Sequence, residues 1–394
     1  MYINKQNGEH MKKDLLIYFA NVISVVCVCV IVAGTAPGYK ETIGKFNTEI
    51  AEAFAPQITL EKIADISETK IEKTGNNSNT ASKSVSRSTD GITGKDSDLY
   101  SDIKVVPADI EKLMSDAEKS IKKEKVKGKT SEEDYFGGGE LVSFGKVEIQ
   151  SKIPSSFYKP DIENLLKQKA DLSIQDLSQP TILVYHSHTT ESYTLLDAGY
   201  YTESLDLRSN DTAKNMVRVG DELVKYLKMQ GIGVIHDREI HDENYSGAYE
   251  SSRKSVEKYL EEYPSIEITI DVHRDDITYD NKTKVKPTAK INEKKAARMM
   301  IIAGAEYGSI KNFPDWECNL RFDLAVQNKV EEMYEGLMRP ILFSERKYNM
   351  FETKNSFLLE VGTDGNTLDE ACYSARLFAT ALGELLKTEY AEKQ

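Results

Sequence analysis

The C-terminal half of the chain alternates short apolar, β-branched runs with helix-patterned segments, and this alternation constrains the fold more than any other feature. The runs that predict strands cover residues 181–185, 232–235, 266–272, 297–303 and 356–361. Strands that alternate with helices are typical of a mostly parallel sheet covered by helices on both faces. We therefore predict an α/β domain over residues 173–394.

Two of the intervening helices are marked by their start signals and by apolar spacing. Asp211 and Thr212 predict the start of the first, whose inward-facing residues recur at helical spacing: Met216, Gly220, Leu223 and Leu227. Asn366 and Thr367 predict the start of the second, whose buried face comprises Ala371, Ala375, Phe378, Leu382 and Leu385. Ligands of open α/β sheets bind beyond the carboxyl ends of the strands, so we expect site residues directly after the strands.

The N-terminal segment predicts a membrane anchor at residues 15–36. Residues 15–35 contain no charged side chain, and Lys12 and Lys13 precede them. A helix of this length rises about 30 Å, which matches the hydrocarbon thickness of a bilayer. The lysines favour a cytoplasmic tail at residues 1–14 and an extracytoplasmic location for the rest. A cleaved signal peptide is the alternative, because small residues follow the apolar run.

Residues 37–172 predict an extracytoplasmic linker that is largely disordered or weakly structured. Residues 75–98 consist almost wholly of Gly, Asn, Ser, Thr, Lys and Asp, which cannot bury enough apolar surface to offset the entropy lost on folding. Residues 108–128 are charged with a helical rhythm, and residues 140–158 predict a short folded element. The linker would hold the C-terminal domain at a distance from the bilayer.

Composition excludes several classes of function. The chain carries 51 basic and 64 acidic residues, a net charge of −13, which argues against binding to nucleic acid. It has four cysteines, at positions 27, 29, 318 and 372, and they form neither a disulfide framework nor a cysteine zinc motif. Phosphate-binding glycine loops and a GxSxG nucleophile motif are absent from the sequence. Any bound metal would therefore be held by histidine and carboxylate side chains.

Histidines and carboxylates follow three of the predicted strands. The first strand leads into His188-x-x-Glu191, the third into His273, and the last contains Glu360. Two imidazoles and one carboxylate are a common zinc ligand set in hydrolytic sites, where the fourth position holds water. Glu360 is the candidate general base, because a buried glutamate at a strand end is unusual unless it is paired or functional.

Two alternatives for the ligands stay open. Strand alternation directs His186 and His188 to the same face, so either is a candidate ligand. We favour His188 because its spacing to Glu191 lets one turn present both side chains, with His186 then supporting the ligands from behind. Asp211 is a possible substitute for Glu191.

Arg274 and the remaining histidines are harder to assign. Arg274 either stabilises an oxyanion during catalysis or forms a structural pair with Asp271 or Asp275. His236 and His241 follow the second predicted strand without a carboxylate cluster, so we interpret them as surface residues. A single histidine at a strand end is more often structural than a ligand, and it is the coincidence of the three strand ends that favours a metal site.

At these residues the sequence resembles the stage II sporulation protein P family of endospore-forming bacteria. The segments that carry the resemblance are LVYHSHTTESY (183–193), residues 215–237, TIDVHRDD (269–276), residues 319–325 and FLLEVGTDGNTLDEA (357–371). Together they cover roughly residues 180–390, in order along the chain.

The resemblance implies a membrane-anchored, zinc-dependent N-acetylmuramoyl-L-alanine amidase, and the family is also credited with endopeptidase action. It implies that peptidoglycan is the substrate, that His188, Glu191 and His273 bind Zn²⁺, and that Glu360 is the catalytic carboxylate. The family functions in forespore engulfment, in a membrane complex with stage II sporulation proteins D and M. The domain would then lie between the mother-cell and forespore membranes. Two alternatives remain, a stem-peptide endopeptidase and a non-catalytic, membrane-tethered scaffold that binds the wall.

Overall fold

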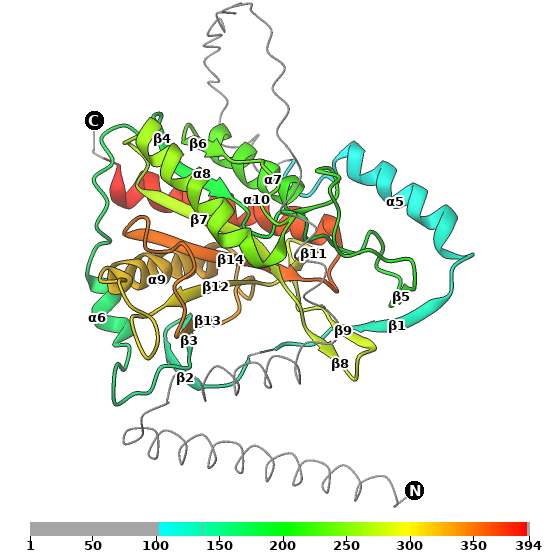
Figure 1. Ribbon diagram of the computed structural model, residues 1–394, viewed down its shortest axis with the longest axis horizontal. Helices are drawn as coiled ribbons and strands as arrows, with labels where there is room; N and C mark the ends of the chain where they lie inside the picture. Colours follow the sequence, from blue (N-terminus) through cyan, green and yellow to red (C-terminus); the bar gives the residue numbers. More distant parts are fainter. Residues whose placement is uncertain (1–101, 136, 392–394) are drawn as a thin grey trace, which may run out of the picture. The chain divides into compact units, whose positions relative to one another are not determined.

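A sheet of eight strands, flanked by helices, forms the centre of the folded part of the chain (Figure 1). The computed structural model describes residues 102–135 and 137–391. The strand order across the sheet is β2-β3-β13-β12-β14-β7-β4-β6. The bounds of these strands are β2 (Glu140–Phe144), β3 (Val147–Ser151), β4 (Pro180–Tyr185), β6 (Gly233–His236), β7 (Ile268–Asp275), β12 (Met299–Gly304), β13 (Ile341–Ser344) and β14 (Asn355–Thr363).

The sheet is mixed, which corrects the prediction of a mostly parallel one. Strands β14, β7, β4 and β6 are parallel to one another, and so are β12, β13 and β3. The two blocks meet where β12 pairs antiparallel with β14, and β2 pairs antiparallel with β3 at the edge. Apolar runs reveal strands but not their direction, because both directions bury the same side chains. The predicted site residues that lie on strands, His273, Arg274 and Glu360, belong to the first block.

Helices cover both faces of the sheet, as predicted. The helices are α5 (Ala108–Ile121), α6 (Ile162–Lys167), α7 (Met216–Met229), α8 (Ala248–Glu262), α9 (Trp316–Met333) and α10 (Leu368–Leu385), with a 3₁₀ turn at Tyr245–Gly247 and a π turn at Leu386–Tyr390. Ile182 and Val184 of β4 belong to the large core that α7, α9 and α10 complete. Leu183 and Tyr185 point to the opposite face, where α8 contributes Val256. This alternation explains why the run is apolar throughout.

Residues 102–172 contain regular structure, although the sequence assigned them to the linker. Strand β3 pairs with β13, so it is part of the central sheet, and its Val147 and Ile149 are fully buried. Strand β1 (Val126–Ser131) joins a smaller sheet of order β5-β1-β9-β8. The remaining strands are β5 (Tyr200–Thr202), β8 (Thr278–Tyr279), β9 (Thr283–Val285), β10 (Thr288–Ile291) and β11 (Lys294–Ala297). The folded unit therefore begins well before residue 173.

The predicted tail, anchor and first part of the linker, residues 1–101, lie outside the described residues. Within residues 102–135 and 137–391, no helix is both long enough and apolar enough to cross a bilayer. The anchor at residues 15–36 stays a prediction.

The two predicted helix starts have different outcomes. Helix α7 begins later than expected, because Asn215 is its N-cap and accepts a hydrogen bond from Val217 N. Asp211 instead accepts a hydrogen bond from Ala213 N within a local turn. Helix α10 begins as predicted, with Thr367 at the N-cap and a reciprocal capping box formed with Glu370. This helix packs against α7 and α9 in the main core, so its start position matters for the whole domain.

We predict that Thr367→Ala lowers the free energy of unfolding by about 1 kcal/mol, because the Glu370 N–H at the start of α10 loses the Thr367 hydroxyl as its acceptor. Chemical denaturation of the purified protein measures this change. Thr367→Ser is the matched control, since it keeps the hydroxyl and should retain most of the stability. Equal stability of the alanine and serine variants would contradict the capping role.

Candidate active site

The carboxyl ends of β4, β7 and β14 lie side by side, and they bring the predicted site residues together. Tyr185 at the end of β4 pairs with Asp271 of β7, and Glu360 of β14 pairs with His273 of β7. The chain bulges after Glu360, where Gly362 adopts a φ of 68° that suits glycine. A Cβ at this position would also meet the Asn366 side chain at 2.6 Å.

His188, Glu191 and His273 form a buried cluster at this edge. Nδ1 of His273 lies 3.6 Å from Oε2 of Glu191, and the rings of His188 and His273 are 5.3 Å apart between centroids. Glu360 lies on the neighbouring strand, directly beside His273. All four side chains are at least nine-tenths buried. The structure thus brings the proposed ligands and the proposed base to one place.

Asp271 fixes the orientation of the His273 ring. Its Oδ1 lies 2.8 Å from Nε2 of His273, on the opposite side of the ring from Glu191. The Asp271 carboxylate also accepts hydrogen bonds from Ser187, from N at 2.8 Å and from Oγ at 2.6 Å. A carboxylate that holds one ring nitrogen leaves the other available to a metal. Asp271 is a positioning residue that sequence reasoning did not assign, although an acidic residue inside an apolar strand was a signal.

Burial and neighbouring charges shift the pKa values of Glu191 and Glu360 in opposite directions. Burial opposes the ionisation of Glu191, but His273, Arg274 and His188 outweigh it and lower the pKa to about 2. Burial raises the pKa of Glu360 to about 8, and the charge of Asp275 adds to this rise. Glu191 is therefore an ionised ligand candidate, whereas Glu360 exchanges a proton near neutral pH.

Three buried polar atoms of the cluster have no hydrogen-bond partner. They are Nδ1 of His188, Oε2 of Glu360 and Nε2 of His273, which contacts Asp271 as an ion pair only. A buried polar atom without a partner is costly, and a bound ion or water at that point explains it. The donor types, two imidazoles and one carboxylate, also fit Zn²⁺. The three ligand side chains are near one another, but their donor atoms are not all within 4.8 Å.

Aromatic side chains from the segment after β6 cover His188. Tyr245 stacks on the His188 ring at 4.4 Å, and Tyr249 meets the same ring edge-on at 5.2 Å. Arg208 lies over the Tyr245 ring, and its Nη2 is 3.8 Å from Oε1 of Glu191. No local pattern in the sequence links residues 208 and 245 to the site, so only the fold reveals them.

The Arg274 guanidinium binds backbone carbonyl groups and pairs with no carboxylate at 271 or 275. Its Nε donates to Ser192 O at 2.9 Å and its Nη2 donates to Leu207 O at 3.0 Å. The guanidinium pairs with neither the Asp271 nor the Asp275 carboxylate, because Asp271 binds His273 and Asp275 pairs with Arg339. Its predicted pairing with Asp271 or Asp275 is therefore wrong, and its role towards an oxyanion stays a prediction.

His186 faces away from the cluster and uses both of its ring nitrogens. Nδ1 lies 3.0 Å from Val272 O, and Nε2 lies 2.9 Å from Nε2 of His236. Gly220 of α7 packs so closely that an added Cβ would meet both rings at 2.6 Å. His186 thus supports β7 just before His273, and His188 is left as the better placed ligand candidate. Asp211 is exposed and pairs with Lys214, and none of its contacts in the described structure reaches the cluster.

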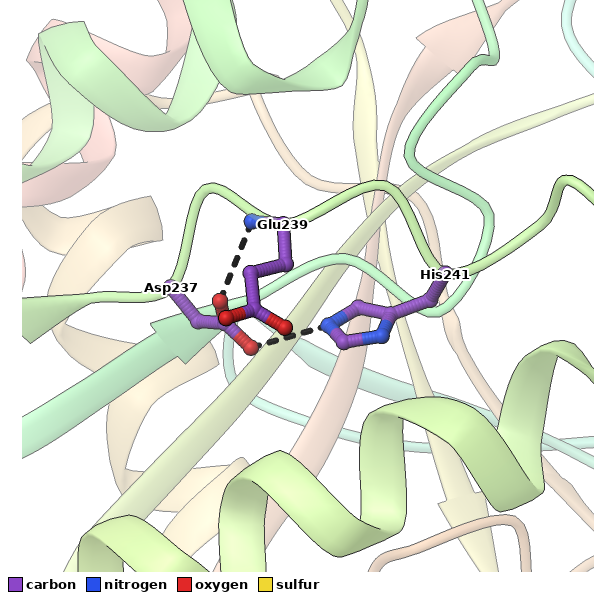
Figure 2. Close-up of side chains that lie close together, drawn as sticks. All are labelled: Asp237, Glu239 and His241. Atoms are coloured by element: carbon purple, nitrogen blue, oxygen red, sulfur yellow. Dashed lines mark hydrogen bonds and ion pairs between the residues drawn. The ribbon is translucent and has the colours of Figure 1, made fainter. Parts of the chain in front are cut away.

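A second group of possible metal ligands follows β6. Figure 2 shows Asp237, Glu239 and His241, the one such group of the described residues whose donor atoms all lie within 4.8 Å. Nε2 of His241 lies 2.9 Å from Asp237 Oδ2, and its Nδ1 lies 3.0 Å from Ser251 Oγ. Both imidazole nitrogens therefore already have partners. These hydrogen bonds stabilise the loop after β6.

The expectation that His236 and His241 are surface residues is wrong. His241 is buried, and the side chain of His236 is only 7% exposed. The His241 backbone N donates to Thr189 Oγ1, which itself bonds His186 O. The loop after β6 therefore supports the loop that carries His188. Sequence reasoning missed this support because it depends on pairing between β4 and β6.

The fold and the site define an α/β protein with a buried histidine and carboxylate cluster at the ends of parallel strands. The family model described as Stage II sporulation protein P (SpoIIP) matches residues 40–383. The chain therefore belongs to the stage II sporulation protein P family.

Individual relatives are more distant. Stage II sporulation protein P of Bacillus subtilis (strain 168) is 29% identical over 217 residues, which are 52% of this chain and 50% of that protein. The match thus spans about half the length of this curated relative. Two solved structures to which the chain is similar are N-acetylmuramoyl-L-alanine amidases. AmiC2 of Nostoc punctiforme has 13% identity and a TM-score of 0.32, and the match covers 52% of this chain and 96% of that chain. The catalytic domain of CwlV from Bacillus (Paenibacillus) polymyxa var. colistinus has 11% identity and a TM-score of 0.33, and the match covers 54% of this chain and 100% of that chain.

We predict that Glu360→Gln changes how the stability of the metal-free protein depends on pH. The folded chain holds the Glu360 proton up to a pH of about 8, whereas the unfolded chain releases it near 4.5. The stability of the parent therefore falls as pH rises through this window, and the glutamine variant lacks that contribution. Urea denaturation at pH 5 and pH 8, in the presence of a chelator, measures the free energy of unfolding. Relative to the parent, the variant should be more stable at pH 8 than at pH 5.

Glu257→Gln, at an exposed position of helix α8, is the control and should give the same difference from the parent at both pH values. If Glu360→Gln behaved like this control, the pKa of Glu360 would not be raised by burial.

Proposed function

We propose that this chain is a peptidoglycan hydrolase that uses zinc to cleave the amide between N-acetylmuramic acid and L-alanine. The observation that carries the proposal is the convergence of His188, Glu191 and His273 beside the buried, unpartnered Oε2 of Glu360. Membership of the stage II sporulation protein P family supports the substrate class.

His188, Glu191 and His273 would hold the zinc. Glu191 is ionised because its pKa is about 2, and the Asp271 carboxylate leaves Nδ1 of His273 facing Glu191. The pKa of His188 is lowered by burial and by His273, which favours the neutral imidazole that binds metals. Bound zinc would supply a Lewis acid and lower the pKa of a coordinated water towards about 7.

Glu360 would move the proton that the reaction requires. Its carboxylate takes a proton from the attacking water as the new C–O bond forms, and it delivers that proton to the nitrogen as the C–N bond breaks. A general base works best when its pKa is near the working pH, and burial raises the pKa of Glu360 to about 8. Arg274 keeps Glu191 in place, because its backbone N lies 3.4 Å from Oε2 of that residue.

The location and partners of the chain are also proposals. We propose a cytoplasmic tail at residues 1–14, a single membrane anchor at residues 15–36 and an extracytoplasmic catalytic domain. The charge pattern around the apolar segment supports this orientation. Family membership supports a role in engulfment beside stage II sporulation proteins D and M. Protease protection of intact cells tests the topology directly.

Product analysis separates the amidase from its alternatives. Digestion of peptidoglycan by the full chain should release stem peptides with an N-terminal L-alanine, which mass spectrometry identifies. Cleaved cross-links alone would instead identify an endopeptidase. If the protein bound no zinc and released no products, even after zinc was added, the non-catalytic scaffold would be favoured.

We predict that Glu360→Gln retains zinc but lowers turnover at least 100-fold, because the variant lacks a proton acceptor. His273→Ala should lose both zinc and turnover, because it removes a ligand. Metal content by mass spectrometry and peptidoglycan digestion by the full chain measure the two effects. Glu257→Gln is the control and should match the parent. If Glu360→Gln turned over substrate at the parental rate, Glu360 would not be the general base. If His273→Ala kept its full zinc content, His273 would not be a zinc ligand.

We predict that Asp271→Asn weakens zinc binding by roughly 10- to 100-fold, because the amide holds the His273 ring less firmly and makes it a poorer ligand. Competition with a fluorescent zinc chelator measures the affinity. Glu257→Gln is the control and should leave the zinc affinity unchanged. Unchanged zinc affinity in Asp271→Asn would show that the residue only packs against the ring.

A further inference from the structure

A cleft of about 400 Å³ opens beside Glu360, and the chemistry assigned above leaves most of its lining unused. The lining comes from β12, β13 and β14, from the segment after β7 and from residues on either side of the β2–β3 hairpin. The residues that matter for the argument are Lys152, Asp276, Arg339, Arg346, Tyr348 and Glu360.

The cleft is continuous with the candidate active site. Glu360 belongs to its lining, and so does Tyr348. Tyr348 stacks on Tyr249 at 4.8 Å, and Tyr249 in turn stacks on His273 at 6.2 Å. A substrate held in the cleft therefore lies next to the proposed base and to the proposed ligand His273.

Two cations in this lining have no carboxylate partner within the described part of the chain. They are Lys152 and Arg346, both of which are exposed, and the Arg346 guanidinium hydrogen-bonds the Tyr348 hydroxyl. Arg339 differs, since its guanidinium lies 3.0 Å from Asp275 and is neutralised by it. Two lining carboxylates have no ion pair in the described residues, Asp276 and Glu360, but Glu360 is buried. At the exposed part of the lining, the two free cations therefore outnumber the one unpaired carboxylate, Asp276.

The positive charge of Lys152 and Arg346 contrasts with the acidic character of the rest of the protein. The chain has a net charge of −13, and the cavity on the Arg208 side is lined by Asp206, Asp242 and Glu243. A local concentration of uncompensated cations in an acidic protein favours an anionic ligand at that point. Guanidinium and ammonium groups bind carboxylates through charge-assisted hydrogen bonds.

We propose that this cleft binds the peptide side of the substrate, through a carboxylate of an acidic stem peptide held by Lys152 and Arg346. The inference rests on the proposed function and specifies which half of the substrate lies where. Glu360 delivers a proton to the nitrogen of the broken amide, and that nitrogen belongs to the peptide. The departing peptide must therefore lie on the Glu360 side of the site, where the two cations are.

Two matched ligands test the proposal. They are the N-acetylmuramoyl dipeptides whose second residue is D-glutamate, with a free α-carboxylate, or D-isoglutamine, in which that group is an amide. Isothermal titration calorimetry measures their dissociation constants with the full chain carrying Glu360→Gln, so that turnover does not interfere. We expect the acid form to bind at least tenfold more tightly, a typical effect of a charge-assisted hydrogen bond.

The additional double substitution Lys152→Ala and Arg346→Ala should abolish this preference and leave the affinity for the amide form within about twofold. Arg346→Lys should retain part of it. Lys347→Ala is the matched control, because it removes a neighbouring positive charge whose Nζ bonds Lys311 O instead of lining the cleft. Both lining cations are exposed, so their loss should leave the melting temperature of the protein unchanged.

Equal affinity for the two ligands, or a preference that survives the double substitution, would overturn the proposal. Failure of both ligands to bind would overturn it as well. Digestion of whole peptidoglycan by the parent distinguishes these results from failure of the proposed function. If the parent releases stem peptides, the hydrolase stands and only the placement of the peptide falls.

Discussion

The parallel pairing of β7 with β4 on one side and with β14 on the other determines where every polar group of the site lies. Because His273 is in register with Glu360, and Asp271 with Tyr185, three segments far apart in sequence end at one edge of the sheet. The apolar side chains of these strands are buried on both faces, which fixes the register. A slip by one residue would turn His273 and Glu360 to the opposite face. The stability of the sheet and the geometry of the site therefore have the same cause.

Buried charge is the second constraint, and the site distributes it by pairing. Glu191 and Asp271 lie on either side of the His273 ring, and the pKa of His273 is consequently raised despite its burial. Glu360 has no such partner, so little offsets the rise in its pKa that burial causes. Two glutamates a short distance apart thus acquire different tasks, since one is a permanent anion and the other a proton carrier. A bound cation would further compensate the negative charge of this cluster.

The sequence predicted the strands and their polar ends because both depend on local pattern. Residues 181–185 and 356–361 are apolar at every position except Thr181, Ser356 and Glu360, which is typical of central strands. Pattern does not encode strand direction, so the antiparallel junction of β12 with β14 was missed. It also placed the start of α7 at Asp211 and Thr212, whereas Asn215, another good N-cap residue, caps this helix. Strand β3 falls within residues 140–158, where the sequence predicted a short folded element, but its pairing with β13 and the Tyr245 contact with His188 depend on tertiary structure alone.

We propose that the metal binds at the strand ends through His188, Glu191 and His273, and not at the compact Asp237, Glu239 and His241 group. X-ray diffraction from zinc-loaded crystals, recorded above and below the zinc absorption edge, locates the ion directly. We expect an anomalous peak within about 2.0–2.2 Å of one donor atom from each of the three strand-end ligands. A single peak at the Asp237, Glu239 and His241 group would contradict it, and so would zinc-soaked crystals without a peak at the strand ends.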